Sequence, residues 1–334
     1  MIQTGLAMSE RSARGQGLYS SERLQELSSG GWLFRFIEQF PQVRQVQRGV
    51  EDACLQGAID LHVHADPCSL MPRNQDFTQV AIEAARAGMR AVVRKDHYYS
   101  TVGEAYAVQR HIDHLVESGV LSHRIEVYGG VPLAQSLDPV RIERALRHPQ
   151  FKMIWCNPVG GEPLVLDGKV RPEVERILQL AAEHGLGLNL GAPSHSAAKN
   201  PGVSDYDGLA PLCERIREIG AKAVLDHPLS SFNADQIEAL SGGSVLAGLF
   251  CYPTLPSIIK APVVDPARTL ELVKRLGPRR CLIASDVGML LEPTALEAYR
   301  LMIRLLIVLG FSEADVSIMI RDNPAQLLGL NGRG

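Results

Sequence analysis

Residues 58–97, AIDLHVHADPCSLMPRNQDFTQVAIEAARAGMRAVVRKDH, contain the unit that decides the fold. The short apolar stretch 58–64 has the length and composition of a buried strand, and residues 76–87 have the apolar period of an amphipathic helix. Gly88 follows this helix directly, as glycine does at many helix C-termini, and a second strand pattern occupies 91–97. The stretch therefore predicts a strand, a helix and a second strand parallel to the first.

The same unit recurs along the rest of the chain. Strand patterns occur at 58–64, 91–97, 125–133, 152–157, 187–191, 223–227, 245–250 and 281–286. Helix patterns occur at 76–87, 102–117, 138–147, 172–184, 206–219, 234–240, 266–276 and 293–309. This alternation predicts an α/β protein with a (β/α)8 TIM barrel. A doubly wound open sheet is the alternative, but eight units leave no obvious edge strand.

Two regions lie outside the repeat. Residues 1–50 are interpreted as an N-terminal extension of the barrel, which occupies residues 51–334. The aromatic stretch 31–37 in this extension predicts a short helix that packs on the barrel or on another subunit, so we expect a homo-oligomer. After the fourth strand, residues 158–171 contain two glycine-rich turns and predict a small hairpin over the top of the barrel.

Composition excludes several classes of protein. The 334 residues include 34 basic and 37 acidic side chains, a balance that gives a net charge of −3 and argues against a nucleic-acid partner. The apolar run 301–309 is interrupted by Arg304 and is shorter than the roughly 20 residues that a membrane helix needs, so we expect no membrane partner. Six cysteines without a Cys-x-x-Cys pair argue against a disulfide framework, and no secretory signal is recognisable, so we expect a cytoplasmic protein.

Ionisable residues occur at the carboxyl ends of several predicted strands, where a buried strand would otherwise be apolar. The first strand ends in His62 and His64, whose spacing of two directs both imidazoles to one face. His195, His227 and Asp286 occupy the corresponding positions after strands five, six and eight. Because the carboxyl ends of all strands of a closed barrel meet at one mouth, we expect these five side chains to converge there.

This set of ligand types predicts a metal centre. Imidazole nitrogens with a carboxylate and no thiolate suit Zn²⁺, with Mn²⁺ or Fe²⁺ as alternatives. One ion is expected at His62, His64 and Asp286, and a second at His195 and His227 if an anionic group bridges the pair. Asp286 is also expected to take a proton from the attacking water and return it to the leaving group.

These residues resemble the metal-ligand motifs of the amidohydrolase superfamily. The resemblance rests on the His-x-His of residues 58–64, on the single residues after strands five, six and eight, and on the ending 322–330. Residues 88–97 and 285–288 are similar to a poorly characterised branch of that superfamily. The resemblance implies a small-molecule substrate and attack of metal-activated water on an amide, a lactone or another ester.

One position departs from the superfamily pattern. Binuclear members of the superfamily carry a bridging carboxylated lysine or a glutamate on strand four, where this chain has only Lys152, at the start of the strand. Lys95, which shares a face with His97 on strand two, is nearer the mouth. Lys95 is therefore expected to be a carbamate bridge between two metals, a cationic substrate ligand or the partner of a carboxylate. The site is accordingly mononuclear or binuclear.

The expected roles divide the residues into three groups. Catalytic roles are assigned to Asp286, His227 and Lys95. Substrate contacts are assigned to His97, Arg73 and Tyr98, with Arg73 able to hold a carboxylate through two hydrogen bonds. Metal ligation is assigned to His62, His64, His195, His227, Asp286 and Lys95.

Three alternatives to metal-dependent hydrolysis of an amide, a lactone or another ester remain open. The same metal frame would support non-oxidative decarboxylation of a small aromatic or unsaturated acid, or hydrolysis of a phosphoester. A barrel whose metal is structural, or whose mouth only binds a ligand, would have no turnover.

Overall fold

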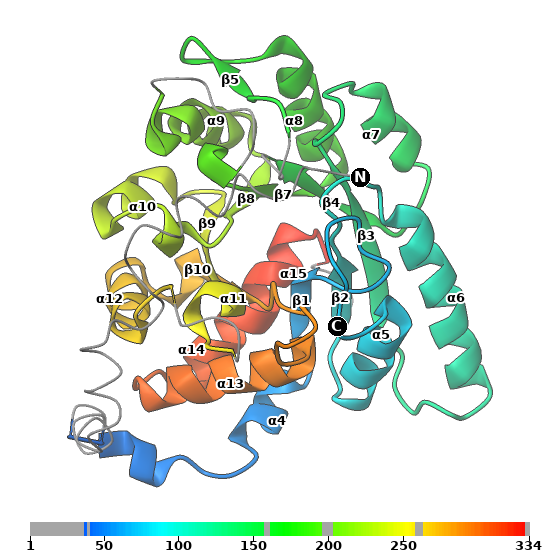
Figure 1. Cartoon of the computed structure of the whole chain (residues 1–334), viewed down its shortest axis with the longest axis vertical. Coiled ribbons are helices and arrows are strands. Elements are labelled where there is room, and N and C mark those ends of the chain that lie inside the picture. The colour runs from blue at the N-terminus through cyan, green and yellow to red at the C-terminus, as the bar shows by residue number, and fades with distance from the viewer. Residues whose placement is uncertain (1–36, 39–40, 157–160, 196–202, 258–262, 331–334) are drawn as a thin grey trace, which may run out of the picture.

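The computed structural model describes residues 37–38, 41–156, 161–195, 203–257 and 263–330. Eight parallel strands form one sheet in the order in which they occur in the chain. These strands are β1 (Ile59–Val63), β2 (Ala91–Arg94), β3 (Glu126–Pro132), β4 (Phe151–Cys156), β7 (Gly187–Leu190), β8 (Lys222–Leu225), β9 (Val245–Phe250) and β10 (Cys281–Ala284). The strands curl into a nearly closed ring with helices between them, so the predicted (β/α)8 barrel is confirmed (Figure 1).

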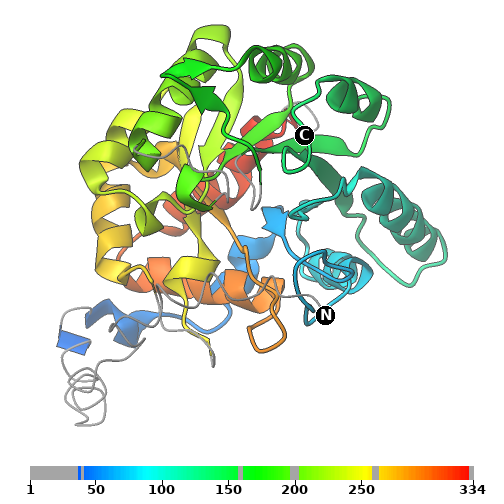
Figure 2. The ribbon, with the colours of Figure 1, turned by 45° about the horizontal axis from the view of Figure 1, so that its top comes forward.

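The helices surround this ring (Figure 2). Those that connect successive strands are α5 (Phe77–Arg86), α6 (Val102–Glu117), α7 (Val140–Ala145), α8 (Pro172–His184), α9 (Asp205–Ile219), α10 (Ala234–Leu240) and α12 (Pro266–Leu276). Their ends follow local rules: Asp76 and Gln79 form a capping box at the start of α5, and Gly185 ends α8 in the left-handed conformation, at φ 64°.

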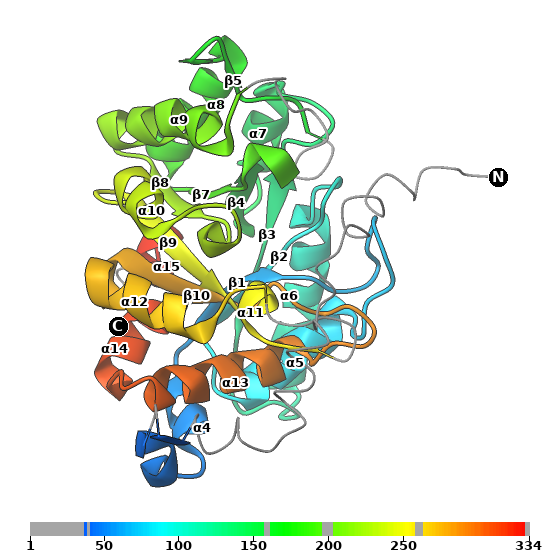
Figure 3. The ribbon, with the colours of Figure 1, turned by 60° about the vertical axis from the view of Figure 1, so that its left-hand side comes forward.

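Further helices precede and follow the repeat. They are α4 (Val50–Leu55), α11 (Cys251–Thr254), α13 (Ala295–Val308), α14 (Glu313–Ser317) and α15 (Asn323–Leu327). Short 3-10 segments occur at Pro41–Gln45, Pro193–His195, Pro228–Ser230 and Pro278–Arg280, and a π-helical turn at Ile318–Asp322. Helix α4 lies against α13 (Figure 3), with an ion pair between Glu51 and Arg304.

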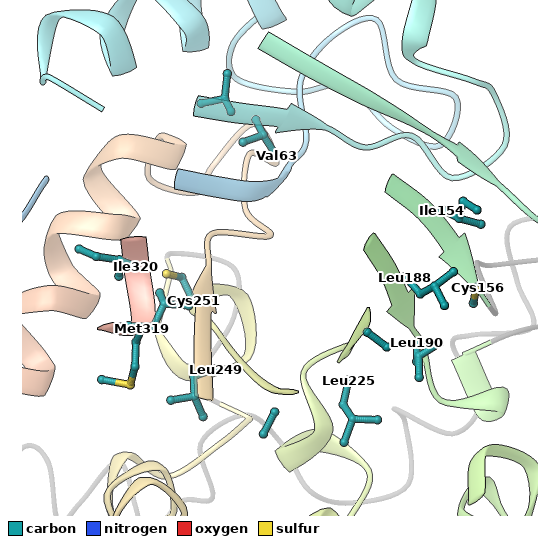
Figure 4. Close-up of a cluster of buried hydrophobic side chains, with 14 of the residues drawn as sticks. Val63, Ile154, Cys156, Leu188, Leu190, Leu225, Leu249, Cys251, Met319 and Ile320 are labelled. Carbon is teal, nitrogen blue, oxygen red and sulfur yellow. The ribbon is translucent and has the colours of Figure 1, made fainter. Parts of the chain in front are cut away.

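The hydrophobic core has two layers, one on each face of the strands. The outer layer lies between strands and helices and includes Val63, Leu188 and Leu225 (Figure 4). The inner layer fills the barrel, and Leu327 of α15 belongs to it. Because α15 supplies apolar side chains to this inner layer, it closes the end of the barrel opposite the mouth.

The predicted hairpin after the fourth strand is present. Strands β5 (Val165–Leu166) and β6 (Lys169–Val170) pair antiparallel around Asp167 and Gly168, both of which have positive φ, as a tight two-residue turn requires. The hairpin packs against α9. The aromatic stretch 31–37 lies outside the described residues except for Ile37. None of the described helices is both long enough and apolar enough to cross a membrane.

Candidate metal centre

A bulge in β1 turns two histidines into the barrel. Asp60 pairs with Val92 and Val63 pairs with Arg94, so a step of three residues in β1 corresponds to a step of two residues in β2. Before the bulge, Leu61 faces the barrel interior, whereas Val63 after it belongs to the outer layer. The bulge thereby lets His62 follow Leu61 inward, and its ring packs against the inner side chains Trp155 and Phe250, at centroid distances of 5.2 and 5.0 Å.

His62 and His64 both face the carboxylate of Asp286. The Nε2 atom of each ring lies 3.1 Å from Asp286 Oδ1. Asp286 comes two residues after the end of β10 and has a φ of 50°, a conformation that a non-glycine residue rarely adopts. His227, after β8, has a φ of 28°. Strained backbone at two strand ends of one mouth is typical of a functional site.

The three ligand atoms fit a single divalent cation. A tetrahedral ion with bonds of about 2.0–2.1 Å separates neighbouring ligand atoms by about 3.3 Å, close to the 3.1 Å between each histidine Nε2 and Asp286 Oδ1. Both nitrogens of His62 are buried without an aligned hydrogen bond, although Nε2 is close to Asp286. A buried polar atom without such a bond is costly, and a shared cation would satisfy it.

Electrostatics keep the two imidazoles neutral and the carboxylate ionised. Burial lowers the pKa of His62 and holds that of His64 well below the ordinary histidine value. Burial alone would raise the pKa of Asp286, but the nearby imidazole of His62 and the hydrogen bond with His64 outweigh it and hold this pKa well below the usual range. Neutral imidazoles beside an ionised carboxylate are the protonation states that a metal requires.

A second group of potential metal ligands lies next to the first. The Nε2 atom of His227 lies 3.6 Å from Asp286 Oδ2 and 3.9 Å from Asp226 Oδ1. Asp286 therefore presents one carboxylate oxygen to each group. The ligand atoms of Asp226, His227 and Asp286 all lie within 4.8 Å of one another, so a second ion has a candidate position here.

Sequence reasoning assigned no role to Asp226, although the signal was present. Val224 faces the barrel interior, and the alternation of a strand carries Asp226 to the same face two residues later. The Oδ1 atom of Asp226 lies 3.6 Å from His62 Nδ1. A carboxylate in this position orients a metal-binding imidazole from behind.

Lys95 lies beside this carboxylate. Its Nζ is 4.0 Å from Asp226 Oδ2 and 5.8 Å from the centre of the Trp155 ring, and the residue is buried. Of the three roles open to Lys95, partnership with a carboxylate has this direct geometric support. Lys152 lies at the opposite end of β4 from the mouth, with Nζ 5.8 Å from the Tyr128 ring.

The residues expected to contact substrate gather on one side of the histidine pair. The ring of His97 stacks on His64 at 4.9 Å, and Tyr98 follows at 6.5 Å from His97. Burial lowers the pKa of His97 to about 3, so its imidazole is neutral at physiological pH. Arg73 Nη2 donates to Nδ1 of His64 at 3.3 Å. His195 ends the 3-10 segment after β7, and its side chain lies outside the described part of the structure.

Side chains bridge β1 and β10, where no strand pairing occurs within the described residues. Oδ1 of buried Asp60 accepts hydrogen bonds from the backbone N–H groups of His62 and Ser285, at 3.2 and 3.1 Å. The Tyr299 hydroxyl lies 2.8 Å from two carbonyl oxygens, one on each strand. Asp286 N also donates to His62 O, at 2.9 Å. We call this set of contacts the seam; it positions the strands that carry His62 and Asp286.

Together, fold and site define a (β/α)8 barrel with a candidate metal centre at the carboxyl ends of its strands. The chain belongs to the family of unknown function DUF6282, whose model matches residues 57–246. The matched region includes the residues of the cluster on β1, β2 and β8 and ends before Asp286. A comparison with curated proteins gave no match.

Solved structures share the fold at low sequence identity. One is a proposed 2-pyrone-4,6-dicarboxylic acid hydrolase from Pseudomonas putida, with 16% identity, a TM-score of 0.53, and coverage of 83% of this chain and 99% of that one. Another is an amidohydrolase from Burkholderia multivorans with bound zinc, with 14% identity, a TM-score of 0.52, and coverage of 81% and 99%. At these identities the likeness shows the fold alone.

Proposed function

We propose that this protein is a metal-dependent hydrolase of small molecules, in which activated water cleaves an amide, a lactone or another ester. The observation that carries the proposal is the buried pair of imidazole Nε2 atoms, each 3.1 Å from one carboxylate oxygen of Asp286. Support comes from the fold, which solved hydrolases share, one of them with zinc. Zn²⁺ is the ion that this donor set favours.

The metal, when bound, would lower the pKa of a water molecule and so supply hydroxide near neutral pH. His62, His64 and Asp286 would hold one ion, and Asp226 and His227 with the other oxygen of Asp286 would hold a second. His195 is retained as a further proposed ligand on the same side of the barrel.

The chain's own residues would manage the proton. Asp286 is ionised and lies at the mouth, so its carboxylate is placed to accept a proton from the attacking water and return it to the leaving group. His227, whose Nε2 lies 3.6 Å from Asp286 Oδ2, is placed to orient the Asp286 carboxyl group for both transfers. Lys95 would keep Asp226 ionised behind His62.

The test combines metal content with turnover. Purified protein is analysed for zinc, manganese and iron, and hydrolysis of p-nitrophenyl acetate and of a simple lactone is measured before and after chelation. His62→Ala and Asp286→Asn are expected to lose bound metal and activity together, whereas His111→Ala, on the exposed side of α6, keeps both. Retention of metal and turnover by the first two variants would refute the proposal. Release of carbon dioxide from an acid substrate without ester cleavage would assign the site to decarboxylation instead.

A further inference from the structure

Arg73 is held at the mouth by its backbone. Its N–H donates to Asp66 Oδ1 at 3.0 Å, and Arg73 forms an isolated antiparallel bridge with Met289 in the loop after β10. The residue is only 7% exposed. Its guanidinium lies against the ring of His64 at the end of β1, and that ring stacks on His97 after β2. Arg73 is therefore a buried cation beside the candidate metal centre, although a loop arginine is usually solvated.

Among the described residues, the guanidinium contacts two uncharged groups. Nη2 donates to His64 Nδ1 at 3.3 Å, and Nε donates to the Cys68 thiol at 3.2 Å. Within the described residues, no carboxylate lies within ion-pair distance of the guanidinium nitrogens of Arg73; Asp66 accepts only from the backbone N–H. The other buried cations of the mouth differ in this respect: Arg94 lies 3.3 Å from Glu104 and Lys95 lies 4.0 Å from Asp226.

A buried charge without a counter-ion is unfavourable, so the guanidinium is expected to receive one from a bound molecule. Asp226 and Lys95 balance each other, and Asp286 faces the imidazoles. Among the buried cations Arg73, Arg94 and Lys95, it is the guanidinium of Arg73 that has no carboxylate of a described residue within ion-pair distance. A guanidinium matches a planar carboxylate through two parallel hydrogen bonds. A phosphate monoester carries nearly two charges and would need further donors, so one guanidinium fits a carboxylate better.

We propose that Arg73 binds a carboxylate group of the substrate, so that the natural substrate is a small carboxylic acid with its scissile bond near that group. This inference builds on the proposed function, since it assumes that substrate enters the same mouth. His64 joins the two parts of the site, because its Nε2 faces Asp286 and its Nδ1 faces Arg73. The carboxylate would thus be anchored on one side of the imidazole while the reacting bond lies on the other.

Calorimetric titration of the full-length protein tests this. Benzoate, glutarate and citrate are compared with benzamide and glutaramide, and with phenyl phosphate, in both metal-free and zinc-loaded protein. We expect at least one carboxylate to bind while its amide does not, and Arg73→Gln to weaken that binding by about tenfold or more. Arg73→Lys keeps the charge but loses the planar guanidinium, and its affinity for the carboxylate is expected to lie between those of the wild type and Arg73→Gln. Arg110→Gln, on the exposed face of α6, is the matched control and leaves binding unchanged.

The outcomes separate this inference from the proposed function. Carboxylate binding that survives in metal-free protein and disappears in Arg73→Gln supports the role of Arg73 even if no metal is found. Unchanged binding in Arg73→Gln, equal binding of acids and amides, tighter binding of phenyl phosphate than of benzoate, or no binding of any acid would each overturn it. Thermal melting shows whether each variant is folded. If Arg73→Gln is unfolded, the carboxylate affinity of Arg73→Lys decides whether Arg73 binds the carboxylate.

Discussion

Arg73 Nη2 donates a hydrogen bond to Nδ1 of His64, and this contact determines which nitrogen of His64 carries the proton. A guanidinium has no acceptor, so Nδ1 must be unprotonated and the neutral ring carries its proton on Nε2, facing Asp286. If a metal ion bound to Nε2, the ring proton would have to be on Nδ1. It would then face the N–H group of Arg73, which is also a donor. Metal loading and release of the Arg73 guanidinium from His64 are therefore expected to occur together.

The first prediction is that Arg73→Gln increases metal affinity. The glutamine carbonyl can accept the Nδ1 proton that arginine cannot, and one positive charge is removed from the neighbourhood of the cation. We expect a gain of about tenfold in zinc affinity, measured by competition with a chelator. Equal or weaker zinc binding would show that the contact between Arg73 and His64 does not govern ligation.

The second prediction concerns Asp60 in the seam. Burial raises its pKa from 3.8 to about 6, so the folded protein binds this proton more tightly than the unfolded chain does. Stability should therefore fall as pH rises from about 4 to about 6, at a cost of up to about 3 kcal/mol. Asp60→Asn keeps an acceptor for Ser285 N and removes the charge, so its free energy of unfolding should exceed that of the wild type at pH 7.5 and approach it near pH 4.

Chemical denaturation over this pH range provides the measurement. Glu117→Gln, an exposed carboxylate at the end of α6, serves as the control and should show no such trend. A destabilised Asp60→Asn at pH 7.5 would mean that the seam depends on the carboxylate charge rather than on an acceptor at this position.

The third prediction concerns Asp96, whose pKa is lowered in the folded protein and which therefore stabilises the fold at high rather than low pH. Burial would raise the pKa of Asp96, but hydrogen bonds from Ser69 and from the N–H groups of Tyr98 and Tyr99 lower it to about 2. Its contribution to stability is complete above about pH 4 and is lost as pH falls towards 2. Asp96→Asn should thus lower the free energy of unfolding by about 2 kcal/mol at pH 7 and by less at pH 3.5. A difference that does not change with pH would contradict this account.

The fourth prediction tests close packing beside the site. The Cβ of an alanine at position 248 would overlap the carbonyl oxygen of Leu225 and the ring of Phe250, which packs on His62. Gly248→Ala should therefore destabilise the protein by about 1–3 kcal/mol. Gly103→Ala, in α6 with open space around it, should instead stabilise by up to about 1 kcal/mol. Thermal melting of the pair gives the comparison, and equal shifts would rule out the steric explanation.

The periodicity of the sequence was sufficient to predict the barrel, because each strand and helix has a local apolar pattern. It also placed His62, His64 and Asp286 at strand ends that the fold brings together. The bulge in β1 was not predictable, since strict alternation would put His62 on the same face as Asp60, which points outward. The burial of Arg73 was also missed, because a loop pairing with Met289 causes it and no local pattern encodes that pairing. The position of Asp226 in the site could have been predicted, because its spacing of two from Val224 places both residues on the same face.

In the described part of the chain β1 and β10 do not pair as strands, and this has a mechanical consequence. Lateral movement of these two strands would disturb a few side-chain bonds and the bond from Asp286 N to His62 O, but no ladder of backbone bonds. The spacing between the histidine pair and Asp286 can therefore adjust more readily than any other strand separation in the barrel. An ion ligated from both strands would cross-link β1 and β10, and its ionic radius would set the distance between these two strands.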